Sequence, residues 1–286
     1  MAKRRKRRRR LRVGRLLLVI LVAGAAVFFN VMLLRLIWNA VFSGSEPVSE
    51  PEPTPTPDPV YKNRYDWQYL NRDEHDICSY EDAEYTSSFG IDVSHYQGQI
   101  DWQAVKRAGV EFAFIRAGYR GYTEGVLHED SWFRTNMDQA VAAGIEVGVY
   151  FFSQAVSAEE AEEEAGYLLS LIQDYPVSEC VYDLEFSSEE ERASANDQNI
   201  NTEAARAFCR KIRESGYTPL VYGSKNFFYH DVRMVDLQDE TEFWLAAYGT
   251  ETPEFPYVFS MWQYSCEGQI EGIDNNVDLN IRFIKK

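Results

Sequence analysis

Short apolar runs alternate with longer amphipathic segments over residues 86–286. The apolar runs predict eight strands, at residues 90–94, 112–116, 147–152, 180–185, 220–223, 244–247, 261–264 and 277–279. Apolar residues at helical spacing predict helices at residues 102–108, 131–143, 158–172 and 202–215. Strands that alternate with helices are typical of a parallel α/β barrel. We therefore expect an α/β fold, a barrel whose later helices are shortened or lost.

The N-terminal segment has a different pattern. Ten Lys or Arg residues and no acid occur in residues 1–15, and an almost unbroken apolar run follows over residues 16–34. Such a run can cross a bilayer as one helix, and the basic cluster predicts that its N-terminus stays in the cytoplasm. A cleaved signal peptide is the alternative, although its apolar region usually has only about 7 to 15 residues. We favour an uncleaved, single-pass signal anchor over residues 16–38, which places the rest of the chain outside the cell membrane.

Two further segments precede the domain at residues 86–286. Residues 39–59 are rich in Pro and Glu and contain almost nothing to bury, which is typical of an extended extracellular linker. Residues 60–85 contain several aromatic side chains but no evident chemistry. We interpret residues 60–85 as an extension that docks on the domain.

Charge separates the two parts of the chain and excludes one class of partner. Eleven of the 29 basic residues lie at or before Arg35, and the first acid is Glu46. The outer part therefore has 18 basic against 45 acidic residues, a formal charge of −27. Such a domain should repel nucleic acid and other polyanions, so a ligand must be held by a shaped groove.

The predicted strand at residues 180–185 contains two carboxylates two positions apart, Asp183 and Glu185. Side chains alternate across a strand, so both should point to the same side, about 6.5–7 Å apart. Two close carboxylates cannot both ionise cheaply, and one of them should hold a proton, as a general acid must. An isolated pair of this kind can also be solvated charge at a strand end. Asp92 and Asp278 lie at other predicted strand ends, so four carboxylates should converge at one end of the barrel.

Ordered motifs along the domain resemble one known family. They are F-G-I-D-V-S-H-Y-Q-G at 89–98, F-I-R-A-G-Y-R-G-Y at 114–122, V-G-V-Y-F-F-S at 147–153, V-Y-D-L-E at 181–185, W-Q-Y-S at 262–265 and N-V-D-L-N at 276–280. In this order they are similar to the signatures of glycoside hydrolase family 25, the Chalaropsis-type lysozymes. The resemblance covers about residues 88–283 and implies a shortened TIM-like (β/α) barrel. It also implies hydrolysis of the β-1,4 bond between N-acetylmuramic acid and N-acetylglucosamine in peptidoglycan glycan strands.

The resemblance further implies roles for the four carboxylates. Glu185 matches the general acid, and Asp183 matches the residue that orients the substrate's 2-acetamido group as it attacks the anomeric carbon. Asp92 and Asp278 match two further acids of the family's site, which would tune the pair or position the sugar. The spacing of Asp183 and Glu185 lies between the separations typical of retaining and inverting glycosidases, so it does not fix the stereochemistry.

Polar and aromatic residues at the same strand ends are candidates for substrate binding. They are Tyr96, Arg116, Tyr150, Tyr222, Tyr248, Gln263 and Tyr264. Tyrosines there can stack on pyranose faces and donate hydrogen bonds, but each is equally suited to packing in the barrel. Arg116 is equally suited to pairing with a barrel carboxylate. We expect His95 to donate a structural hydrogen bond near Asp92, and residues 159–164 to form a solvated helix face.

Cysteine content leaves the oxidation state open. Cys78, Cys180, Cys209 and Cys266 allow one or two disulfides in an extracellular domain, with three ways to pair all four. Their spacing resembles no zinc site, and we expect no cofactor.

Two alternatives to the hydrolase remain. A non-hydrolytic peptidoglycan-binding module is the first, but such a module has no need of a protonatable acid such as Glu185. A divalent ion held by the four carboxylates is the second. Of the histidines, only His95 accompanies that cluster.

Overall fold

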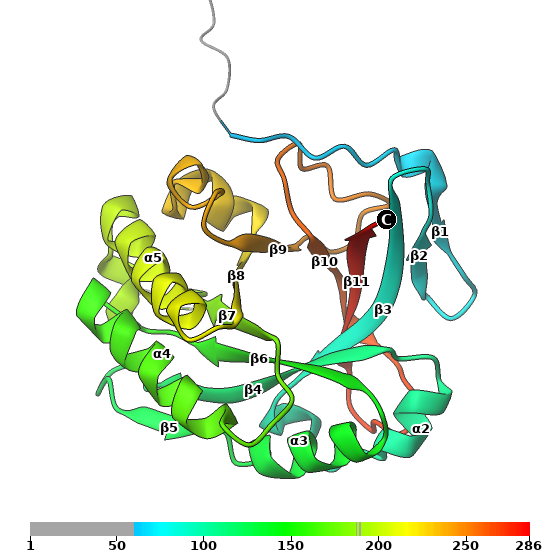
Figure 1. The fold of residues 1–286 in the computed structure, drawn as a ribbon, viewed down its shortest axis with the longest axis horizontal. Coiled ribbons are helices and arrows are strands. Elements are labelled where there is room, and N and C mark those ends of the chain that lie inside the picture. Colours follow the sequence, from blue (N-terminus) through cyan, green and yellow to red (C-terminus); the bar gives the residue numbers. More distant parts are fainter. Residues whose placement is uncertain (1–59, 187, 189) are drawn as a thin grey trace, which may run out of the picture. The chain divides into compact units, whose positions relative to one another are not determined.

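Eight strands close into a barrel in the part of the chain that the computed structural model describes, residues 60–186, 188 and 190–286 (Figure 1). They are β3 Tyr85–Val93, β4 Phe112–Arg120, β6 Glu146–Phe152, β7 Glu179–Asp183, β8 Thr218–Ser224, β9 Glu242–Ala246, β10 Met261–Gly268 and β11 Val277–Lys285. Strand β3 pairs with both β4 and β11, which closes the sheet. A short strand, β5 Leu127–Glu129, extends β4 in an antiparallel hairpin. The eight predicted strands are confirmed.

The last strand departs from the parallel barrel that the sequence predicts. Strand β11 runs antiparallel to both of its neighbours, β10 and β3. Residues 269–276 join β10 to β11, and so short a connection cannot hold the crossover that parallel neighbours need. The start of β11, not its end, therefore lies beside the end of β3. Asp278 pairs in register with Asp92 for this reason.

Helices cover the first half of the barrel and are nearly absent from the second (Figure 1). They are α2 Trp102–Arg107, α3 Phe133–Ala142, α4 Ala158–Ile172 and α5 Gln198–Glu214. Between β8 and β9 the described chain forms only short helical turns, Phe227–Asp231 and Met234–Asp236. Helix α5 begins before its predicted start at residue 202, because the Asp197 side chain accepts a hydrogen bond from the backbone N–H of Ile200.

Large apolar side chains fill the interior of the barrel below its carboxyl end. The buried cluster consists of Phe112, Phe114, Val181, Leu220, Tyr222, Trp244, Ala246 and Met261. Strand β6 passes close to this cluster at Gly148, where a Cβ atom would lie 2.4 Å from the ring of Phe114. Glycine is therefore required at residue 148 by close packing. Above this filled interior, a cavity remains at the end of the barrel to which the parallel strands point.

Residues 60–85 pack on the barrel near the end of β11. The ring of Tyr65 stacks on Phe283 with centroids 4.1 Å apart, and its hydroxyl donates to the carbonyl of Phe259 over 2.6 Å. Two short strands, β1 Leu70–Arg72 and β2 Cys78–Tyr80, form a hairpin in the same segment. Asp278 lies at the opposite end of β11, so the extension and the predicted site occupy different ends of that strand.

Within the described residues, no helix has the length and apolarity needed to cross a membrane. The predicted basic tail, anchor and linker, residues 1–15, 16–38 and 39–59, lie outside those residues.

The four cysteines, for which the sequence left one or two disulfides open, are free thiols in this structure. Cys78, Cys180 and Cys209 are buried and Cys266 is exposed.

Candidate active site

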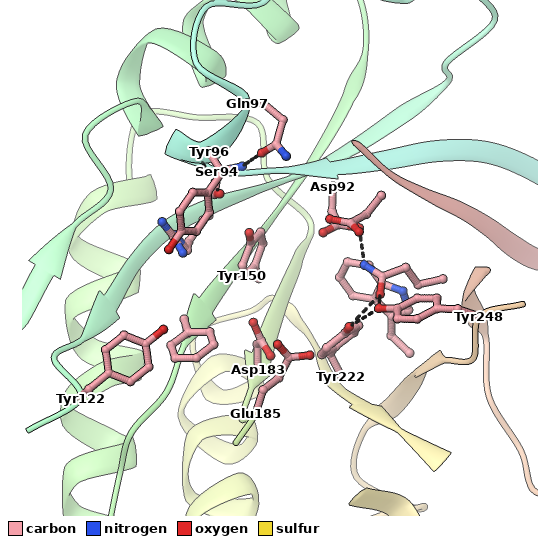
Figure 2. Close-up of a pocket in the computed structure, with 15 residues that line it drawn as sticks. Asp92, Ser94, Tyr96, Gln97, Tyr122, Tyr150, Asp183, Glu185, Tyr222 and Tyr248 are labelled. Atoms are coloured by element: carbon pink, nitrogen blue, oxygen red, sulfur yellow. Dashed lines mark hydrogen bonds between the residues drawn. The ribbon is translucent and has the colours of Figure 1, made fainter. Parts of the chain in front are cut away.

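A cavity of about 280 Å³ opens at the end of the barrel where the parallel strands finish (Figure 2). It is lined by Asp92, Ser94, Tyr96, Gln97, Arg116, Tyr122, Tyr150, Phe152, Asp183, Glu185, Tyr222, Trp244, Tyr248, Gln263 and Asp278. Ten of the eleven residues that the sequence analysis selected are among them. Tyr264 is the exception.

Asp183 and Glu185 bring two carboxyl groups side by side in this cavity (Figure 2). Asp183 is the last residue of β7, and the backbone N–H of Ser153 donates to its carbonyl over 2.7 Å. Its side chain is buried, and Oδ1 has no hydrogen-bond partner within the described structure. Glu185 follows two residues later and remains exposed at the cavity surface. One carboxyl group is thus held inside the cavity and the other faces the space that a ligand would occupy.

The surroundings of this pair favour protonation. Burial raises the pKa of Asp183 well above its usual range, and the charges of Glu185 and Asp92 raise it further, while Arg116 opposes them. The pKa of Glu185 is also raised, mainly because protein replaces water around it. A hydrogen bond from Tyr222 opposes that rise, and the remaining exposure of Glu185 to solvent offsets part of it. Both shifts favour a protonated carboxyl group in the pair, as general acid catalysis requires.

Asp92 and Asp278 form a second carboxyl pair across the β3–β11 ladder. Oδ2 of Asp92 accepts hydrogen bonds from Nε2 of Gln263 and Nδ2 of Asn280, each over 2.7 Å. Burial outweighs these bonds and raises the pKa of Asp92 to about 6. Burial, the charge of Asp92 and a hydrogen bond between the two carboxyl groups raise the pKa of Asp278 to about 8. This second pair also shares a proton at neutral pH.

Side-chain amides fix the position of Asp92. The indole N–H of Trp244 donates to Oδ1 of Asn280 over 2.9 Å, so the amide of Asn280 must turn its NH₂ group toward Asp92. The hydroxyl groups of Tyr222 and Tyr248 both donate to Oε1 of Gln263, which turns its NH₂ group toward Asp92 in the same way. Asn280 was not predicted as a site residue, although its spacing two residues after Asp278 puts both on one face of β11.

Arg116 both lines the cavity and makes a buried ion pair. Its Nε donates to Oδ2 of Asp130 over 2.8 Å, and its guanidinium lies 5.5 Å from the ring centre of Tyr96. The backbone N–H of His95 donates to the same Asp130 oxygen over 3.1 Å, so His95 is tied to Asp130 rather than to Asp92. Asp130 was not predicted, because the β4–β5 hairpin that brings it to Arg116 has no clear pattern in the sequence.

Tyr264 does not line the cavity, which corrects its predicted role in substrate binding. Its ring is buried, and its hydroxyl accepts a hydrogen bond from the backbone N–H of Cys78 over 3.3 Å. Neighbouring residues of a strand point to opposite faces, so when Gln263 points into the barrel Tyr264 must point out of it.

Glu164 corrects the prediction that residues 159–164 form one solvated face. It is fully buried, and its carboxylate accepts hydrogen bonds from Nε of Arg120 over 2.7 Å and from the hydroxyl of Ser153 over 2.6 Å. Burial outweighs these partners and raises the pKa of Glu164 to about 7. Glu164 thus links helix α4 to Arg120 of β4 and to Ser153. The backbone N–H of Ser153 in turn donates to the carbonyl of Asp183 at the end of β7.

In residues 60–286, apart from 187 and 189, no group of three or more His, Cys, Asp or Glu side chains is arranged to hold a metal ion.

Comparison with known proteins places this site in one family. A sequence profile of "Glycosyl hydrolases family 25" matches residues 91–273. Lysozyme M1 of Streptomyces globisporus is 31% identical over 211 residues, covering 67% of this chain and 66% of that protein. The autolytic lysozyme of Clostridium acetobutylicum is 28% identical over 192 residues, covering 67% of this chain and 54% of that protein. The chain thus spans about half to two thirds of the length of these relatives.

A solved structure supports the same grouping. The modular autolysin LytC of Streptococcus pneumoniae, in complex with a synthetic peptidoglycan ligand, matches with a TM-score of 0.61 and 25% identity. The match covers 69% of this chain and 47% of that one. The profile match alone spans more than half of the chain, and its limits enclose three of the four strand-end carboxylates, Asp92, Asp183 and Glu185. This protein belongs to glycosyl hydrolases family 25.

Proposed function

We propose that the protein hydrolyses the β-1,4 bond between N-acetylmuramic acid and N-acetylglucosamine in peptidoglycan. The observation that carries the proposal is the carboxyl pair of Asp183 and Glu185, whose pKa values are both raised in an open cavity of a family 25 domain. Two of the relatives are lysozymes, and a third protein of similar fold was solved with a peptidoglycan ligand. The barrel itself we interpret as a modified TIM-like barrel, because its cavity lies where the parallel strands end.

In this proposal Glu185 is the general acid. It faces the ligand space, and the rise in its pKa favours the protonated form that can give a proton to the leaving glycosidic oxygen. The bond from the anomeric carbon to that oxygen breaks as the carbonyl oxygen of the substrate's 2-acetamido group attacks the same carbon. Water then opens the resulting ring, and the Glu185 carboxylate takes a proton from that water.

Asp183 orients the attacking acetamido group. Its Oδ1 is buried and has no hydrogen-bond partner within the described structure, so it can accept the N–H of the acetamido group. Asp92 and Asp278 hold a shared proton close by and limit the negative charge that faces the sugar. Tyr96 and Tyr248 are 66% and 43% exposed, which suits stacking on sugar rings at the rim of the cavity.

The test is digestion of purified peptidoglycan by the full chain in mild detergent, beside Glu185→Gln and the exposed control Glu162→Gln. Product ends are reduced with borohydride and identified by mass spectrometry. We expect reduced muramic acid ends from the parent and from Glu162→Gln, and none from Glu185→Gln. Binding without release by the parent would refute the hydrolase and favour a non-hydrolytic peptidoglycan-binding module.

We also propose that the protein is held in the cell membrane by residues 16–38, with its N-terminus in the cytoplasm and its catalytic domain facing the wall. The apolar run after ten basic residues supports this topology. The test has two parts. Protease added to intact protoplasts should degrade the catalytic domain, because that domain faces outward. In untreated cells the domain should be found with the membranes and not in the soluble fraction. Release of a soluble domain from untreated cells would favour a cleaved signal peptide.

A further inference from the structure

A second cavity, of about 390 Å³, borders Glu185. Tyr122, Phe152 and Glu185 line both this cavity and the one that contains Asp183, so the two are neighbours and Glu185 lies at their boundary. Residues from the end of β8 and from the turn Phe227–Asp231 complete the second cavity.

The position of Glu185 indicates what the second cavity holds, and this step rests on the proposed function. A general acid protonates the oxygen that joins two sugars, so one sugar must lie on each side of it. The sugar that is attacked lies with Asp183 in the first cavity. The leaving-group side of the glycan strand must then enter the second cavity. The aromatic rings of Phe152, Phe186 and Phe227 give that cavity apolar surface for a sugar face.

Asp231 gives the second cavity a carboxylate with no cationic side chain in the cavity lining. Its carboxylate has no hydrogen bond or ion pair with the described residues, and no cationic side chain is among those that line the cavity. Partial burial raises the pKa of Asp231, and His230, the preceding residue, lowers it. A carboxylate that is partly removed from water is costly unless a ligand supplies an opposite charge. Glu185, the other carboxyl group at this cavity, carries the catalytic proton and does not need such a partner.

We propose that the second cavity binds a primary ammonium group on the leaving-group side of peptidoglycan, through Asp231. Two parts of the polymer carry this chemistry: the C2 amine of a glucosamine that has lost its acetyl group, and the side-chain amine of a diamino acid in the peptide stem. In either case the enzyme prefers strands with a free amine over fully acetylated ones. An acetylated amine has no charge to pair with Asp231 and adds bulk to the cavity.

The experiment compares four glycan substrates with the full chain in mild detergent. Two are peptide-free strands with glucosamine either N-acetylated or de-N-acetylated, and two are peptide-bearing, N-acetylated strands with side-chain amines either free or chemically acetylated. The variants are Asp231→Asn and the control Asp174→Asn, which removes one exposed charge that lines neither cavity. The measured quantity is the ratio of kcat/KM with the amine free to that with the amine acetylated.

We expect the parent and Asp174→Asn to prefer the free amine about five-fold, the upper range for a partly exposed charge pair. Asp231→Asn should reduce that ratio to about one. A preference confined to the peptide-free strands assigns the ammonium to glucosamine, and one confined to peptide-bearing strands assigns it to the stem. No preference by the parent on either pair, or the same preference in Asp231→Asn, overturns the proposal.

A binding measurement separates this proposal from the proposed function. Calorimetry of the same strands with Glu185→Gln, alone and combined with Asp231→Asn, requires no turnover. A free-amine preference in binding that Asp231→Asn removes supports the cavity's ligand even if the parent hydrolyses nothing. Hydrolysis that depends on Glu185, with binding indifferent to the amine, leaves the hydrolase intact and refutes the role of Asp231.

Discussion

Asp278 keeps its proton to a pH far above that of an ordinary aspartate, and this has a consequence for stability. In the folded protein its pKa is about 8, whereas in the unfolded chain it is near 4. Between these values the folded state binds more protons than the unfolded state. The contribution of Asp278 to the free energy of unfolding must therefore fall as pH rises from about 4 to 8. Asp92, with a pKa of about 6, contributes with the same sign up to that pH.

We expect Asp278→Asn to remove part of this dependence, because asparagine has no proton to lose. At pH 8 the variant should be more stable than the parent by roughly 1–3 kcal/mol, and at pH 4 the two should be nearly equal. Urea unfolding followed by tryptophan fluorescence at the two pH values checks this. A difference in stability between parent and variant that stays constant from pH 4 to 8 would show that the carboxyl pair is not protonated in the fold.

Tyrosines inside and outside the cavity should respond differently to loss of the hydroxyl. Tyr222→Phe removes the hydroxyl that donates to Gln263 and that lowers the pKa of Glu185, and we expect kcat/KM to fall about 10- to 100-fold, as for a lost buried hydrogen bond. Tyr264→Phe removes only the acceptor for the backbone of Cys78, so its kcat/KM should match the parent. Steady-state assays on soluble glycan strands measure both. Equal losses of kcat/KM in the two variants would argue that the side chain of Tyr264 points into the cavity and not away from it.

The single-residue predictions succeeded where one simple rule applied. Parallel strands end at the same edge, so residues at predicted strand ends, such as Asp92 and Tyr222, line one cavity. Side chains alternate across a strand, so Gln263 and Tyr264 must point to opposite faces. Both were nevertheless predicted as substrate-binding residues because both lie at the same strand end. Asp130 and Glu164 could not be predicted, because their partners Arg116 and Arg120 reach them through a hairpin and through helix packing that no local pattern reveals.

At the scale of elements, helix α4 is attached to the barrel by one buried ion pair. Glu164→Ala removes the buried one of the two carboxylates that pair with Arg120, while Glu163 stays in place, and we expect it to destabilise the fold by about 1–3 kcal/mol. Glu162→Ala is the matched control on the same helix, since its pair with Arg210 is exposed and should contribute less than about 1 kcal/mol. Urea unfolding of both variants tests the contrast. Similar small losses would mean that water or a neighbouring group replaces Glu164.

The antiparallel direction of β11 was not predicted from the sequence pattern. An alternating pattern predicts a strand but is the same whichever way the strand runs. The length of the connection carries the missing information, since residues 269–276 are too few for a crossover. Counting those residues would have predicted both the antiparallel strand and the route by which Asp278 reaches the site.

At the scale of the whole molecule, the aromatic residues of the extension, residues 60–85, close the end of the barrel away from the site. Tyr65 and Trp67 stack on Phe283 and Phe259, and Tyr80 is almost completely buried. Without residues 60–85, the apolar surface at the end of β11 would face water. The extension therefore contributes to the stability of the domain although it contributes nothing to the cavity.

We expect a fragment of residues 86–286 to unfold at a Tm roughly 10 °C below that of residues 60–286, because the loss of several buried aromatic contacts costs at least about 3 kcal/mol. Calorimetry of the two fragments measures the difference. Tyr65→Ala in the longer fragment should give an intermediate Tm, and the exposed control Tyr69→Ala should give none of the decrease. Equal Tm values for the two fragments would mean that residues 60–85 do not stabilise the barrel and that the folded domain begins at residue 86.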